Sequence, residues 1–208
     1  HYPRPATACA ALVTAGEGLL ARGGKITSTQ TNAQGLMLLC AMKQNPEYHP
    51  IGWQATAKRL LISPIPFIRA TALEKMPLPL DPACIDLVSA LIHDPFTATQ
   101  AAALDLAVRT KVARFGEDAL QVLTVTKDEW IVGSAFQTAK QCGIPQDKVL
   151  EVCINRFDEP GMIMMLFQPI MSSVFIHEGG YGTSGTITTD EARRLKTRWQ
   201  AFLEENRE

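Results

Sequence analysis

Apolar residues recur along this chain at intervals of three and four, which is the spacing of one face of an α-helix. The pattern is clear over residues 85–92, 120–123 and 149–153. No segment shows a sustained strict alternation of apolar and polar residues, and the strand-like stretch 174–176 is too short to build a sheet. The pattern therefore predicts an all-α protein.

Glycines, prolines and short polar residues divide the chain into about eleven helices. The first is expected over residues 6–21, before two glycines. A proline at the first helical position, preceded by a side chain that accepts backbone N–H groups, is typical of helix starts. Such starts occur at Ser63-Pro64, Asp81-Pro82 and Asp94-Pro95. Single capping residues are expected at Asp128 and Asp158, and a capping box at Thr188 and Glu191.

The chain also contains an internal repeat. Residues 64–73 (PIPFIRATAL) align without a gap with residues 95–104 (PFTATQAAAL), at a spacing of 31. The same steps, 31 and then 32, relate three sets of positions: Ala72, Ala103 and Ala135; Leu73, Leu104 and Phe136; Met76, Ala107 and Ala139. A period in the low thirties predicts a stack of small helical units.

These units resemble HEAT-like repeats, in which an Asp-Pro start is followed by an apolar residue, an arginine and a buried alanine. Ile68-Arg69 with Ala72 fits this pattern best, whereas Gln100 and Val132 replace the arginine in the next two units. The resemblance implies an α-solenoid, a right-handed stack of antiparallel helix pairs. It is clearest over residues 50–158.

We expect one repeat domain over residues 1–208. Residues 159–208 would form a degenerate C-terminal capping unit, containing a glycine-rich loop at 179–188. Pro169 should kink or end the helix in which it lies. The methionines at 162, 164 and 165 favour a buried helix over an adaptable contact groove. Because the chain begins with His1 rather than methionine, we expect it to be part of a longer protein with repeats upstream.

The composition of the chain argues against several classes of protein. Hydrophobic residues make up 46% and charged residues 20%, which is typical of a folded protein. The formal net charge of −1 argues against nucleic-acid binding, since no basic excess is available to neutralise phosphates. No apolar run approaches the roughly 20 residues that span a bilayer, so no membrane span is predicted.

No catalytic, metal or cofactor site is predicted. The five cysteines, at positions 9, 40, 84, 142 and 153, form no CxxC motif. We interpret them as structural thiols, which favours a reducing compartment such as the cytoplasm. The four histidines form no HExxH motif, and residues 180–185 match GxGxxG without a preceding strand. Tyr181 in that loop is a candidate partner contact.

The leading hypothesis is a non-catalytic scaffold that binds another protein. Its concave face would be lined by polar positions of the second helices: Asp86, Ser89, Gln121, Thr124, Lys127, Glu151 and Asn155. The alternative is an enzyme on a HEAT-like scaffold, similar to the alkylpurine DNA glycosylases. That alternative would require Trp53 and Trp130 to converge with a carboxylate such as Asp128 in a basic pocket, with Trp199 the third tryptophan of the chain.

Overall fold

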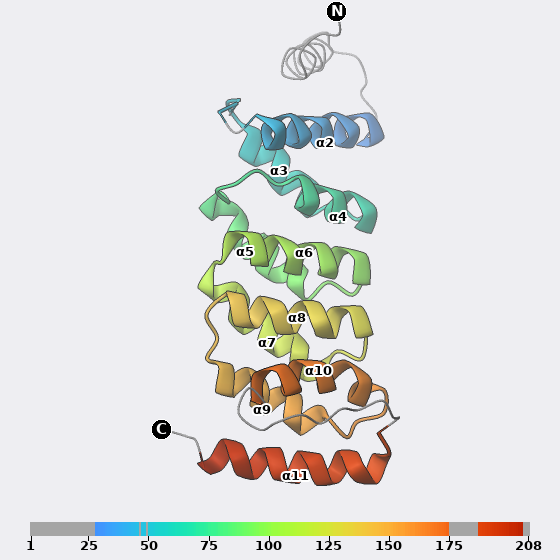
Figure 1. Cartoon of the computed structure of the whole chain (residues 1–208). Coiled ribbons are helices and arrows are strands. Elements are labelled where there is room, and N and C mark those ends of the chain that lie inside the picture. Colours follow the sequence, from blue (N-terminus) through green and yellow to red (C-terminus); the bar gives the residue numbers. More distant parts are fainter. Residues whose placement is uncertain (1–27, 46, 49, 175–186, 206–208) are drawn as a thin grey trace, which may run out of the picture. The chain divides into compact units, whose positions relative to one another are not determined.

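The structure is a computed structural model that describes residues 28–45, 47–48, 50–174 and 187–205, with some side chains left out. All regular structure in these ranges is helical, as the hydrophobic pattern predicts (Figure 1). The helices are α2 (Ser28–Gln44), α3 (Trp53–Leu61), α4 (Pro66–Lys75), α5 (Pro82–Ile92), α6 (Thr97–Thr110), α7 (Ala113–Val125), α8 (Glu129–Gln141), α9 (Gln146–Arg156), α10 (Met162–Val174) and α11 (Thr189–Glu205). The helix expected over 6–21 lies outside the described residues.

Several predicted helix starts are confirmed. Asp81 accepts a hydrogen bond from the Ala83 amide ahead of Pro82. Asp128 accepts from two amides in the first turn of α8. Thr188 and Glu191 form the reciprocal capping box, in which the Thr188 amide donates to the Glu191 carboxylate at 2.8 Å and the Glu191 amide donates to the Thr188 hydroxyl at 3.3 Å.

Other predicted starts were wrong by two to four residues. α4 begins at Pro66 rather than Pro64, and α6 begins at Thr97. Asp158 lies four residues before α10 and binds Lys196 instead of capping. At each of these starts, a polar group binds the side chain of an arginine or a lysine. The local sequence does not reveal that partner. α10 continues through Pro169 to Val174, so the proline does not end this helix.

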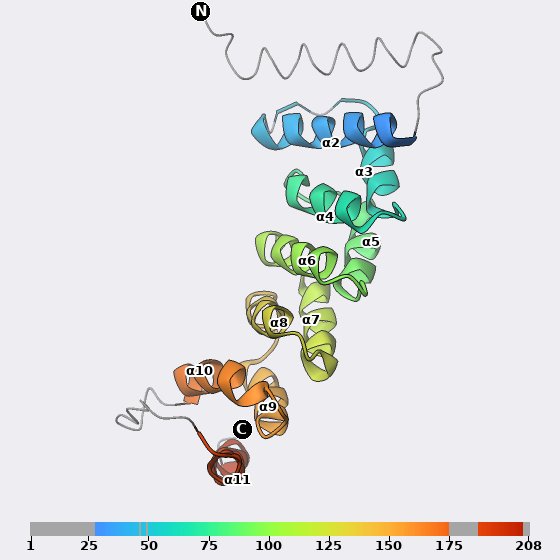
Figure 2. The same cartoon turned by 90° about the vertical axis from the view of Figure 1, so that its right-hand side faces the viewer.

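The chain divides into two compact units, His1–Thr110 and Lys111–Glu208. In the first unit α2, α4 and α6 pack side by side in one row, and α3 and α5 pack on each other in a second row (Figure 2). α3 also contacts α2 and α4, and α5 contacts α6. This unit therefore has two layers of helices.

The second unit has the same two-layer construction. α8 packs on α10 in one row. In the second row, α9 packs on both α7 and α11. α7 contacts α8, and α9 contacts both α8 and α10. No helix among the described residues is long and apolar enough to cross a membrane.

The positions that define the repeat form the buried centre of the two layers. All nine are buried, and the three alanines at 72, 103 and 135 are fully so. Small residues at these positions allow neighbouring helices to approach closely. The register read from the sequence therefore marks the residues on which the layers pack.

Candidate functional site

A buried ion pair joins two turns of the first unit. The Arg69 guanidinium of α4 donates to both carboxylate oxygens of Asp94, at 2.8 and 3.0 Å. It also donates to the Ser63 carbonyl at 2.7 Å and lies 5.6 Å from the centroid of the Phe96 ring. Because Asp94 also accepts from the Phe96 amide, this cluster fixes the turns before α4 and α6 relative to each other.

The C-terminal end of α4 receives cations from both neighbours in its row. Lys43 of α2 donates to the Glu74 carbonyl at 2.7 Å, and Arg109 of α6 donates to the Leu73 carbonyl at 3.1 Å. The last carbonyls of a helix have no partner within it and carry partial negative charge. The two cations therefore serve as caps that connect successive helices.

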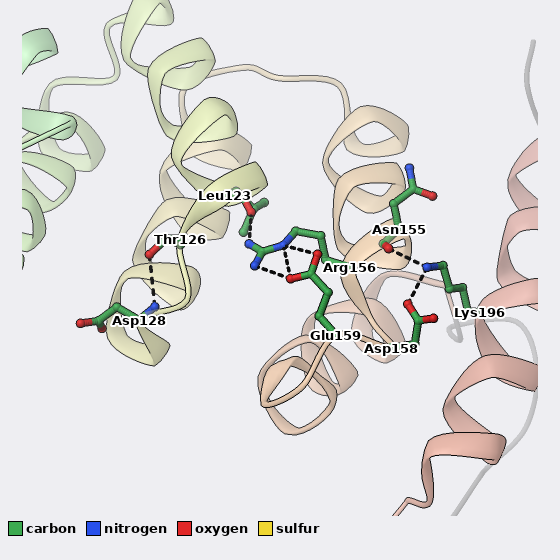
Figure 3. Close-up of polar contacts among 8 residues, drawn as sticks. All are labelled: Leu123, Thr126, Asp128, Asn155, Arg156, Asp158, Glu159 and Lys196. Atoms are coloured by element: carbon green, nitrogen blue, oxygen red, sulfur yellow. Dashed lines mark hydrogen bonds and ion pairs between the residues drawn. The ribbon is translucent and has the colours of Figure 1, made fainter.

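The second unit repeats this arrangement (Figure 3). Arg156, at the end of α9, donates to the Leu123 carbonyl near the end of α7. The same guanidinium binds Glu159 through two nitrogens, at 2.7–3.2 Å. The hydrogen bond from Arg156 lowers the pKa of the Glu159 carboxyl below its ordinary value.

α11 contacts α9 through a second cluster of this kind (Figure 3). Lys196 donates to the Asn155 carbonyl at 2.7 Å and to the Asp158 carboxylate. Gln200 donates to the Asn155 side chain at 3.0 Å. The hydrogen bond from Lys196 lowers the pKa of the Asp158 carboxyl. Beside these bonds the Trp199 ring meets Phe157 edge-on, with centroids 4.8 Å apart.

These clusters use charged groups to hold helices together. No group of three or more histidine, cysteine, aspartate or glutamate side chains in the described residues is arranged to hold a metal ion. Cys84, Cys142 and Cys153 are buried thiols, and burial raises the pKa of Cys153 to about 12. A thiol that stays protonated at neutral pH is a poor nucleophile.

In each unit, large apolar side chains are exposed near the starts of the helices in one row, α4 and α6 in the first unit and α8 and α10 in the second. Phe67 is 72% exposed and Phe96 52% in the first unit, and Trp130 is 82% exposed and Met164 78% in the second. α4 and α6 are joined through α5 by two short turns, so they run in the same direction and begin at the same edge. The same holds for α8 and α10. We call these four residues the turn edges.

The polar positions predicted to contact a partner have different surroundings. Asp86, Gln121, Thr124 and Lys127 are exposed, and Glu151 is half-buried. Ser89 is only 5% exposed, so a partner would not reach it. Asn155 is exposed but holds α11 through both its carbonyl and its side chain. Tyr181 lies outside the described residues.

The residues considered for an enzyme have different surroundings. Trp53 and Trp199 are buried, and only Trp130 among the tryptophans is exposed. The Asp128 carboxylate accepts from the Trp130 and Ile131 amides as the cap of α8.

Periodicity could have located part of the turn edges in the sequence. Phe67 and Trp130 each stand five residues before a buried alanine, Ala72 or Ala135. At about 100° per residue, five steps place a side chain roughly 140° away from the buried one. An aromatic residue at that position is directed away from the packed face.

Comparison with protein-family models, with curated proteins and with solved structures gave no match for this chain.

Proposed function

We propose that this chain is a non-catalytic protein-interaction module whose helix pairs are HEAT-like repeats stacked in an α-solenoid. The single observation that carries the interaction role is the exposure of Phe67, Phe96, Trp130 and Met164 at the turn edges. Aromatic residues and methionine are enriched in protein interfaces, and tryptophan is the most common anchor residue there.

The rest of the chemistry supports a binding role over a catalytic one. The buried or half-buried cations Arg69, Arg109, Arg156 and Lys196 bind helix carbonyls or carboxylates. Arg69 fixes the turns before α4 and α6, and the other three cations connect the C-terminal ends of helices to their neighbours. A rigid scaffold with exposed aromatic residues at its turns binds a partner with little loss of conformational entropy.

The test is affinity capture from a lysate with quantitative mass spectrometry, comparing three chains. They are the wild type, the Phe67→Ser/Trp130→Ser double variant and the Ile51→Ser variant. Ile51 is fully exposed but lies ahead of α3, outside the turn edges. We expect the double variant to keep its helical circular dichroism and to lose at least 90% of a partner that the Ile51→Ser chain retains (about tenfold, as for the loss of one interface anchor). Equal capture by all three chains would contradict the proposal.

A further inference from the structure

α11 packs on α9 as α9 packs on α7. In both contacts a cation of the later helix donates to a carbonyl near the C-terminal end of the earlier one: Arg156 to Leu123, and Lys196 to Asn155 (Figure 3). In both, the cation also binds an acidic residue that follows α9, Glu159 or Asp158. At the end of α9, the Asn155 carbonyl therefore accepts the cation of α11, and the Phe157 ring beside it contacts Trp199.

The cation that holds α11 on α9 is less buried than the cation that holds α9 on α7. Arg156 is buried and binds the partly exposed Glu159 through two nitrogens, whereas neither Lys196 nor Asp158 is buried. Among the described side chains of α11, only Ala192 and Trp199 are buried. Residues 175–188 separate α10 from α11, the longest separation between consecutive described helices. Because only two described side chains of α11 are buried and the bond between Lys196 and Asp158 is partly exposed, this contact can open while the rest of the unit remains folded.

We propose that α11 is a displaceable occupant of the α9 face, and that this face binds an amphipathic helix of a partner protein carrying lysine and tryptophan three residues apart. This inference rests on the proposed interaction function and specifies one class of partner. The spacing is that of Lys196 and Trp199, which lie on one face of α11.

Each feature of such a helix has a matching group on the α9 side. Phe157, at 4.8 Å, and Phe167, at 6.4 Å between ring centroids, receive the indole. The Asn155 carbonyl and the Asp158 carboxylate receive the ammonium group. An apolar face seated on a helical surface with a cation at its border is a common way to recognise a peptide helix.

The test titrates a labelled peptide with the sequence of residues 187–205 into the full chain. In the Lys196→Ala/Gln200→Ala chain the internal α11 competes less well, since both side chains that hold Asn155 are shortened. We expect this chain to bind the peptide at least tenfold (about 1.4 kcal/mol) more tightly than the wild type. The control is the Arg193→Ala chain, which loses only an exposed ion pair within α11. Its affinity for the peptide should stay within twofold of that of the wild type. A peptide with alanine at both the lysine and the tryptophan should not bind.

Hydrogen exchange on the full chain gives an independent readout. A displaceable α11 would exchange its amides at least tenfold faster than α9. If α11 exchanged together with α9 and the peptide bound no variant, α11 would be a fixed part of the second unit and the inference would fail. That outcome would leave the proposed function intact, because its capture experiment depends on Phe67 and Trp130. If all three chains captured the partner equally while the peptide still bound, only the proposed role of the turn edges would be contradicted.

Discussion

At the residue scale, the contact between Arg69 and Asp94 shows what one buried ion pair contributes to the first unit. Both side chains are buried, and the arginine satisfies three acceptor atoms. Removal of one member of a buried pair leaves an uncompensated charge in a medium of low dielectric constant, which costs more than the loss of an exposed pair. The pair is therefore best tested against the Asp105–Arg109 pair in the same unit, in which the aspartate is largely exposed.

We predict that Asp94→Ala lowers the free energy of unfolding by about 3 kcal/mol or more. Asp105→Ala, the matched control, should lower it by less than about 0.5 kcal/mol, since the Asp105 side chain is largely exposed. Urea denaturation followed by circular dichroism measures both values. Similar losses in the two variants would show that burial does not distinguish the pairs.

The Cys153 thiol gives a second prediction at this scale. It is buried, and burial raises its pKa to about 12. We expect iodoacetamide at pH 7.5 to modify Cys153 at least a hundredfold more slowly in the native chain than in 6 M guanidinium chloride, as expected for a thiol that needs unfolding to ionise. Peptide mapping by mass spectrometry separates this site from the other cysteines. Rapid native modification would mean that α9 is less well packed than described.

At the element scale, the predictions from the sequence were most accurate for helix starts that depend on local geometry alone. Asp81, Asp128 and the Thr188–Glu191 box were correctly placed. The predictions were less accurate for Asp94 and Asp158, whose partners lie 25 and 38 residues away. Asp94 accepts the nearby Phe96 amide and also binds Arg69, and the local sequence reveals only the first of these partners.

Two glycines of the second unit test helix packing directly. A Cβ at Gly116 of α7 would lie 3.0 Å from the Ile144 side chain and 3.2 Å from the Cys142 carbonyl oxygen. A Cβ at Gly133 of α8 would meet nothing within 4 Å. We predict that Gly116→Ala destabilises the protein by about 1–3 kcal/mol. Gly133→Ala should stabilise it by about 0.5–1 kcal/mol, because alanine restricts the unfolded chain.

Thermal and urea unfolding of both glycine variants measure these changes. Stabilisation by both alanines would show that the loop between α8 and α9 lies farther from α7 than described.

The contact of α9 and α11 should weaken in acid. The pKa values of Asp158 and Glu159 are lowered by their hydrogen bonds to Lys196 and Arg156. The stability from a lowered carboxyl pKa is complete above the ordinary value, about 4, and is lost as the pH falls through the folded-state value. We therefore expect urea midpoints to be level from pH 7 to about 5 and to fall below about pH 4. Asp158→Asn should flatten this fall, whereas the exposed Glu204→Gln should not.

At the scale of the whole molecule, the repeat register was predicted from the sequence and the surface was not. All nine register positions are buried, six in the first unit and three in the second. Exposure depends instead on which helix faces lack a neighbour. Asn155 illustrates the difference, since its place on a polar face was predicted but its contact with α11 was not. Trp130 was considered only for the pocket of an enzyme, and Phe67 and Phe96 were not singled out, because the sequence does not show which helix faces lack a neighbour.

The most direct test of an interaction module built on these edges compares two surfaces against one captured partner. One chain carries Phe67→Ser and Trp130→Ser, and the other carries Asp86→Ala, Gln121→Ala and Glu151→Ala on the second helices. Calorimetric titration gives the Kd of each. We predict a loss of affinity of at least tenfold for the first chain and of less than threefold for the second, because exposed aromatic residues are the stronger anchors. The reverse order would place binding on the polar face of the second helices and contradict the role of the turn edges.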